Sequence, residues 1–63
     1  MFIQYEVWGV GDGREELIEC VPTLKEAEKI LEDEVELNDL YDEIFILEDK
    51  DDELTEIKRL PTK

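Results

Sequence analysis

The stretch PTLKEAEKILEDEVEL, residues 22–37, decides the fold of this 63-residue chain. Thr23 can cap a helix, and Glu26 follows three residues later, which is the spacing of a capping box. Apolar side chains then recur at helical spacing along one stripe, at Leu24, Ala27, Ile30, Leu31 and Val35. The pattern predicts one amphipathic helix that ends near Leu37 and buries a single face.

The residues on either side of this helix predict two β-hairpins. Residues 2–10 (FIQYEVWGV) are rich in β-branched and aromatic side chains, GDGR at 11–14 is typical of a tight turn, and residues 15–21 return as a second strand. Residues 42–48 contain the run IFIL, which is apolar on both faces and indicates a central strand. Residues 49–52 then predict a turn, and residues 53–60 predict a polar edge strand.

Together these elements predict an α+β fold. We expect a single small domain, ββαββ, with one helix packed on a four-stranded antiparallel sheet. The two most apolar strands belong in the middle of the sheet, so the expected strand order is 2-1-3-4, numbered along the chain. We expect residues 1–63 to form one domain, in which residues 60–63 are a flexible tail.

The first hairpin predicts which side chains face the core. Its turn sets three cross-strand pairs, which are Val10 with Glu15, Val7 with Ile18, and Tyr5 with Cys20. The face that carries the last two pairs is apolar, and we assign it to the core beneath the helix. Cys20 is therefore expected to be buried.

The other face of the same hairpin carries a second apolar group, made of Phe2, Trp8, Val10 and Leu17. One helix leaves the second face of the sheet uncovered, so these side chains would form an exposed patch that buries on binding a partner or a second copy of the chain. Trp is a frequent anchor at such surfaces. The alternative is that the register is shifted by one residue and that Trp8 belongs to the core.

The charge of the chain limits its partners. Twenty Asp and Glu residues against seven Lys and Arg residues give a net charge of −13. Such a charge repels nucleic acid and anionic membranes and attracts basic proteins. We therefore expect no direct binding to nucleic acid or to membranes. Near the C-terminus, Lys58, Arg59 and Lys63 can relieve some of the repulsion, for example by pairing Lys58 with Glu43.

The acidic residues are concentrated from the helix through the second hairpin. We predict a partner-binding surface made of Glu28, Glu32, Asp33, Glu36, Asp39, Asp42, Asp49, Asp51, Asp52 and Glu53. Because duplex DNA carries one negative charge per ~1.7 Å of its axis, a rigid protein with many carboxylates can occupy the DNA-binding groove of a basic protein. Small acidic proteins of phages and mobile elements are similar to this chain in size and charge. The alternative is that the acidity only keeps a small protein soluble.

Residue types that serve catalysis and metal binding are scarce. The chain has no histidine and no serine, and Cys20 is its only cysteine, which excludes a disulfide within the chain and a tetrahedral zinc site. An EF-hand that started at Asp49 would need Gly and Glu where Leu54 and Leu60 stand. We therefore expect no enzyme activity, no cofactor and no metal. The lone cysteine and the lack of a secretory signal favour a cytoplasmic protein.

Two functional hypotheses remain from the sequence. The first is a small acidic protein-binding module, such as an inhibitor that mimics DNA and binds a basic, nucleic-acid-binding host protein. The second is a homodimeric structural or adaptor protein whose interface is the apolar sheet face and whose acidity only confers solubility.

Overall fold

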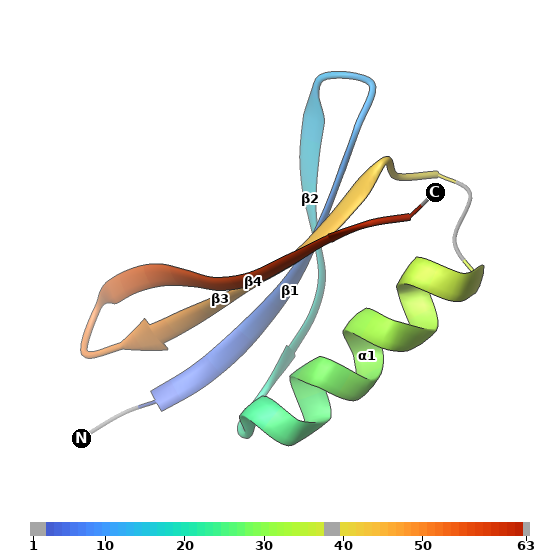
Figure 1. The fold of residues 1–63 in the computed structure, drawn as a ribbon. Helices are drawn as coiled ribbons and strands as arrows, with labels where there is room; N and C mark the ends of the chain where they lie inside the picture. The colour runs from blue at the N-terminus through green and yellow to red at the C-terminus, as the bar shows by residue number, and fades with distance from the viewer. Residues whose placement is uncertain (1–2, 38–39, 63) are drawn as a thin grey trace.

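The computed structural model of the chain describes residues 3–37 and 40–62, and it contains one helix on one side of a twisted sheet (Figure 1). The elements follow the order β1 (Ile3–Gly11), β2 (Arg14–Val21), α1 (Leu24–Leu37), β3 (Glu43–Lys50) and β4 (Glu53–Pro61). All neighbouring strands are antiparallel, and the strand order is β2-β1-β3-β4. The predicted α+β class, the ββαββ sequence of elements and the strand order are therefore confirmed.

The helix begins and ends where its sequence pattern predicts. The backbone N–H of Glu26 donates a hydrogen bond to the Thr23 side-chain oxygen over 3.3 Å, which satisfies one of the free donors at the helix N-terminus. The backbone N–H of Ala27 donates to the Thr23 carbonyl over 3.2 Å. Ala27 and Leu31, one turn apart on the apolar stripe, are the fully buried residues of the helix. Among the described residues, no helix has the length and apolar character to cross a membrane.

The core is one thin layer between the helix and the two central strands. Val7 of β1 and Ile44 and Ile46 of β3 have no exposed surface, and they pack against Ala27 and Leu31. Partly buried side chains surround them, namely Tyr5, Ile18, Val21, Ile30, Val35, Tyr41 and Leu60. Burying one large aliphatic side chain stabilises a fold by about 1.5–3 kcal/mol. A few such residues therefore supply much of the stability of this domain.

Both hairpins close through two-residue loops whose central residues have positive φ. Asp12 and Gly13 have φ values of 53° and 74°, and Asp51 and Asp52 have 50° and 71°. This is the type I′ geometry, which matches the twist of the flanking strands and favours glycine at its second position. The predicted pair of Val10 with Glu15 is confirmed. The second loop is shorter than predicted, because residues 49 and 50 belong to β3.

Replacing Asp52 by glycine is expected to stabilise the protein. Asp52 occupies the loop position that Gly13 holds in the first hairpin, and an L-residue pays a steric cost there. We expect Asp52→Gly to raise the free energy of unfolding by about 0.5–1 kcal/mol in urea titrations. Asp52→Asn removes the same charge and serves as the control. An equal gain in both variants would assign the effect to charge instead of backbone geometry.

A β-bulge in β2 changes the predicted pairing of the first hairpin. Trp8 pairs with Leu17 as the predicted register requires, but the register shifts by one residue between Val7 and Trp8. Val7 therefore pairs with Glu19, and the predicted pair of Val7 with Ile18 is wrong. Ile18 is the extra residue of the bulge, and it packs against the core.

The same bulge brings Cys20 out of the core. Cys20 pairs with Glu6 and is exposed, whereas Val21 pairs with Tyr5 and packs against the core. The predicted pair of Tyr5 with Cys20 and the predicted burial of Cys20 are therefore wrong. Ile18 and Val21 are three residues apart, so a regular strand would place them on opposite faces. The bulge allows both side chains to contact the core.

The end of β4 is tied to the loop before β3. The Thr62 hydroxyl donates to the Tyr41 carbonyl over 2.6 Å, and the Thr62 backbone N–H donates to the Asp42 carbonyl over 2.9 Å. The backbone N–H of Asp42 in turn donates to the Val10 carbonyl over 2.6 Å. Of the residues predicted to form a flexible tail, Leu60 and Pro61 belong to β4 and pair with β3, and Thr62 makes the bonds just described. Lys63 lies outside the described residues.

Tyr41 packs its ring directly on the backbone of Gly9. A Cβ atom added to Gly9 would lie 2.5 Å from the ring carbons of Tyr41, which is closer than any normal contact. The Tyr41 hydroxyl donates a hydrogen bond to Glu16 over 2.7 Å, and this bond to a carboxylate is the main reason that the pKa of Tyr41 is raised. Gly9 therefore provides the space in which the ring closes one end of the core.

Gly9→Ala is expected to destabilise the fold because its methyl group would overlap the Tyr41 ring. Overpacking of this kind costs about 1–3 kcal/mol of unfolding free energy, measurable by urea denaturation. The double variant with Tyr41→Ala provides the control, because alanine at position 9 should cost much less once the ring is gone. An equal cost in both backgrounds would show that the ring is not responsible.

Candidate protein-binding surface

A row of four side chains crosses all four strands on the face of the sheet opposite the helix. Leu17 of β2 pairs with Trp8 of β1, Trp8 pairs with Phe45 of β3, and Phe45 pairs with Arg59 of β4. Side chains at directly paired positions lie on the same face of a sheet and contact each other. The row therefore places two aromatic rings at the centre of what we call the uncovered face.

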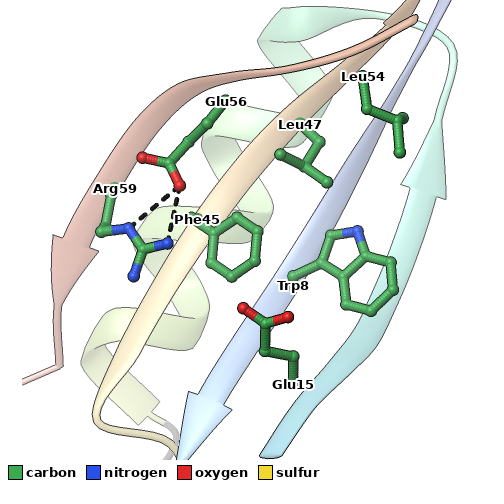
Figure 2. Close-up of a pocket in the computed structure, with 7 residues that line it drawn as sticks. All are labelled: Trp8, Glu15, Phe45, Leu47, Leu54, Glu56 and Arg59. Atoms are coloured by element: carbon green, nitrogen blue, oxygen red, sulfur yellow. Dashed lines mark hydrogen bonds and ion pairs between the residues drawn. The ribbon is translucent and has the colours of Figure 1, made fainter.

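The two rings of this row lie side by side and nearly parallel. The ring centroids of Trp8 and Phe45 are 6.4 Å apart, and the ring planes differ by 8°. Figure 2 looks onto the uncovered face, with the helix behind the sheet, and shows both rings nearly face-on. The indole N–H of Trp8 donates a hydrogen bond to Glu6 over 2.9 Å, which restrains the orientation of the ring.

Phe45 is covered by a cation from the neighbouring strand. The guanidinium carbon of Arg59 lies 4.6 Å from the centroid of the Phe45 ring, and Phe45 is only 5% exposed. Arg59 also forms ion pairs with Glu56, at 2.7 Å, and with Glu43, at 2.9 Å. The hydrogen bonds from Arg59 lower the pKa of Glu56, and the same bonds raise the pKa of Arg59.

A shallow hollow of about 390 Å³ surrounds the aromatic pair. Its walls, drawn in Figure 2, are Trp8, Glu15, Phe45, Leu47, Leu54, Glu56 and Arg59. Leu54 is 58% exposed, and Leu17, next to Trp8 in the row, is 50% exposed. The uncovered face thus combines apolar contact area with carboxylates.

The predicted apolar group is largely on this face. Trp8 and Leu17 belong to the cross-strand row, and Val10 is two residues from Trp8 along β1 and half-buried. The structure thus places Trp8 on the uncovered face and not in the core. Phe2 lies outside the described residues.

Sequence reasoning missed the contributions of β3 and β4 to the uncovered face. Phe45 and Leu47 had a detectable signal, because a strand that is apolar on both faces must present half of its side chains away from the helix. For Leu54 and Arg59, the sequence contained no signal that would place them on this face. A second register shift, between Ile46 and Leu47, makes Ile57 the unpaired residue of β4 and sets which of its side chains lie opposite β3.

The predicted acidic surface is divided between the two sides of the sheet. Glu32 and Asp33 lie on the outer face of the helix, where they line a depression of about 450 Å³ together with Lys25, Glu28 and Lys29. Glu28 also forms an ion pair with Lys58 over 3.4 Å. The predicted pairing of Lys58 with Glu43 is therefore wrong, because Lys58 reaches the helix while Arg59 takes Glu43.

The remaining predicted acidic residues lie at the ends of elements and in the second hairpin. Glu36 is exposed in the last turn of the helix, Asp42 is exposed just before β3, and Asp39 lies outside the described residues. Asp49 accepts a hydrogen bond from Gln4 over 3.2 Å. Asp51, Asp52 and Glu53 are exposed at the hairpin tip. Within residues 3–37 and 40–62, no group of three or more Cys, Asp and Glu side chains is arranged to hold a metal ion.

Cys20 lies at the border of the uncovered face and carries a thiol that resists ionisation. Partial desolvation is the largest cause that raises its pKa, and the carboxylates of Glu6 and Asp49 raise it further. Because the thiolate is the nucleophile, this environment slows the reactions of Cys20 near neutral pH.

We expect Cys20 to react with iodoacetamide in the native state, because it is exposed, but more slowly than a cysteine in an unstructured peptide at pH 7.5. The alkylation rate of Cys20 should rise at a higher pH than the rate of the peptide does. Added salt should reduce this difference, because it screens the two carboxylates. The rates can be followed by mass spectrometry. A native-state alkylation rate at or above that of the peptide would contradict the raised pKa of Cys20.

Comparison of the chain with protein-family models, with characterised proteins and with solved structures found no match.

Proposed function

We propose that this chain is a small protein-binding module that binds a basic protein through the uncovered face of its sheet. The observation that carries the proposal is the Trp8–Phe45 pair, which lies with exposed leucines on a sheet face without a covering layer. An aromatic anchor within an apolar patch is typical of protein interfaces.

The charge of the chain supports a basic partner. Carboxylates border the aromatic pair, among them Glu6 and Glu15, and Arg59, a cation on this face, is already shared between Glu43 and Glu56. With a net charge of −13, the whole molecule attracts positively charged surfaces and repels negative ones. Complementary charge of this kind speeds association and selects among partners.

Proteins that bind nucleic acid form a class whose surfaces fit this description. Their binding grooves are rich in Lys and Arg, and an acidic protein seated there competes with the phosphate backbone. This supports the role of an inhibitor that takes the place of nucleic acid. The second hairpin, with Asp49 beside the uncovered face and exposed Asp51, Asp52 and Glu53 at its tip, would extend the acidic contact.

A homodimer is the competing candidate, and the same apolar face favours it. Pairing the uncovered faces of two chains would bury Trp8, Leu17 and Leu54 together. That arrangement would also bring two chains of −13 each into contact, and like charges across an interface oppose association. The charge therefore supports a different, basic partner over self-association.

The test is capture of binding proteins by the immobilised chain at low and high salt. We expect a basic protein to be retained at 50 mM salt, released by a few hundred millimolar salt and released by added duplex DNA. Trp8→Ala should weaken its binding by about 2 kcal/mol or more, as for a central aromatic anchor. Leu37→Ala, which shortens an exposed apolar side chain at the far end of the helix, is the matched control and should change little.

Two results would contradict the proposal. The first is capture that is insensitive to salt and to Trp8→Ala. The second is a dimer in sedimentation experiments that dissociates on Trp8→Ala, which would support the homodimer instead. Amide NMR spectra of each variant establish that the fold is retained.

A further inference from the structure

We propose that the hollow beside Trp8 accepts an arginine side chain of the basic partner, with its guanidinium laid on the indole ring and paired with the carboxylate of Glu15. This inference rests on the function proposed above and specifies the chemistry of the partner's anchor.

The neighbouring ring already holds such an arrangement within the chain. Arg59 lies 4.6 Å from the Phe45 centroid while two carboxylates, those of Glu43 and Glu56, bind its guanidinium. The aromatic face supplies attraction to the cation, and the carboxylates supply directed, charge-assisted hydrogen bonds. The uncovered face is thus chemically suited to hold arginine.

Trp8 offers a second aromatic ring one strand away, and no cation of residues 3–37 and 40–62 lies over it. Its ring is parallel to Phe45 within 8° and, as Figure 2 shows, is turned to the same side of the sheet. Over the described parts of the chain, Arg59 on Phe45 is the cation–aromatic contact that the structure contains. Indole is the aromatic side chain that binds cations best. The ring face of Trp8 is therefore the position on this surface where a further cation would bind most favourably.

Glu15 supplies the carboxylate for this second position. It lines the same hollow as Trp8 and pairs with Val10, so it lies on the diagonal from Trp8 across the β1–β2 pair. Diagonal neighbours on one face of a sheet are within reach of long side chains. Leu47 and Leu54, on the other walls, offer apolar surface to the methylene stem of an arginine.

Arginine fits this site better than lysine. The guanidinium is planar, stacks on an aromatic ring and can form two parallel hydrogen bonds with one carboxylate. An ammonium group is compact and more strongly hydrated, so it gains less from the flat ring and the single carboxylate. The site is therefore expected to prefer arginine to lysine, although both residues carry the same charge.

The experiment compares a hexa-arginine peptide with a hexa-lysine peptide. We expect calorimetry to show roughly two- to fivefold tighter binding of hexa-arginine at low salt. Trp8 is the only tryptophan, so its indole N–H signal in NMR spectra reports contact at the site, and hexa-arginine should shift it more than hexa-lysine. Trp8→Phe should retain part of the preference for arginine, whereas Trp8→Leu should abolish it.

Glu15→Gln and Glu32→Gln form a matched pair of variants. Both remove one negative charge, the first at the hollow and the second on the outer face of the helix. We expect Glu15→Gln to weaken hexa-arginine binding by roughly two- to fivefold more than Glu32→Gln does.

The outcomes separate this inference from the proposed function. Equal binding of the two peptides, together with equal effects of Glu15→Gln and Glu32→Gln, would overturn the arginine site while leaving a charge-driven basic partner in place. If neither peptide binds at low salt, both the arginine site and the proposed function are wrong.

Discussion

A single helix can cover only one face of a four-stranded sheet, and most of this structure follows from that constraint. Ala27 and Leu31 of α1 seal the core against Val7, Ile44 and Ile46, and the molecule is only 15 Å across its thinnest dimension. The opposite face must therefore protect its own apolar surface. It does so by setting Trp8 and Phe45 side by side and by laying Arg59 over Phe45.

The excess of negative charge gives the few cations a structural role. Lys58 reaches from β4 to Glu28 of the helix, and Arg59 joins Glu56 of its own strand to Glu43 of β3. These pairs are partly exposed, so each contributes modestly, and those with Glu28 and Glu43 link the edge strand β4 to the helix and to β3. The other carboxylates of the chain set the field that an approaching protein would meet.

Much of the fold was predictable because its signals are local. The cap at Thr23, the apolar stripe of the helix and the glycine-rich first turn each act within a few residues, and the apolar character of residues 44–47 indicates a central strand. The site was less predictable. Alternation along β2 places Cys20 inside and Val21 outside, yet the bulge reverses both, because packing of Ile18 and Val21 on the same core outweighs regular pairing.

The sequence by itself determined the elements, their order across the sheet and the negative charge, since these depend on composition and on periodicity within each segment. Only the tertiary structure decided what the uncovered face contains. Leu17, Trp8, Phe45 and Arg59 come from four strands, and their alignment into one row depends on three cross-strand registers, of which the bulge in β4 alters the one that pairs Phe45 with Arg59. A shift of one residue moves a side chain to the other face, so no single segment encodes the row.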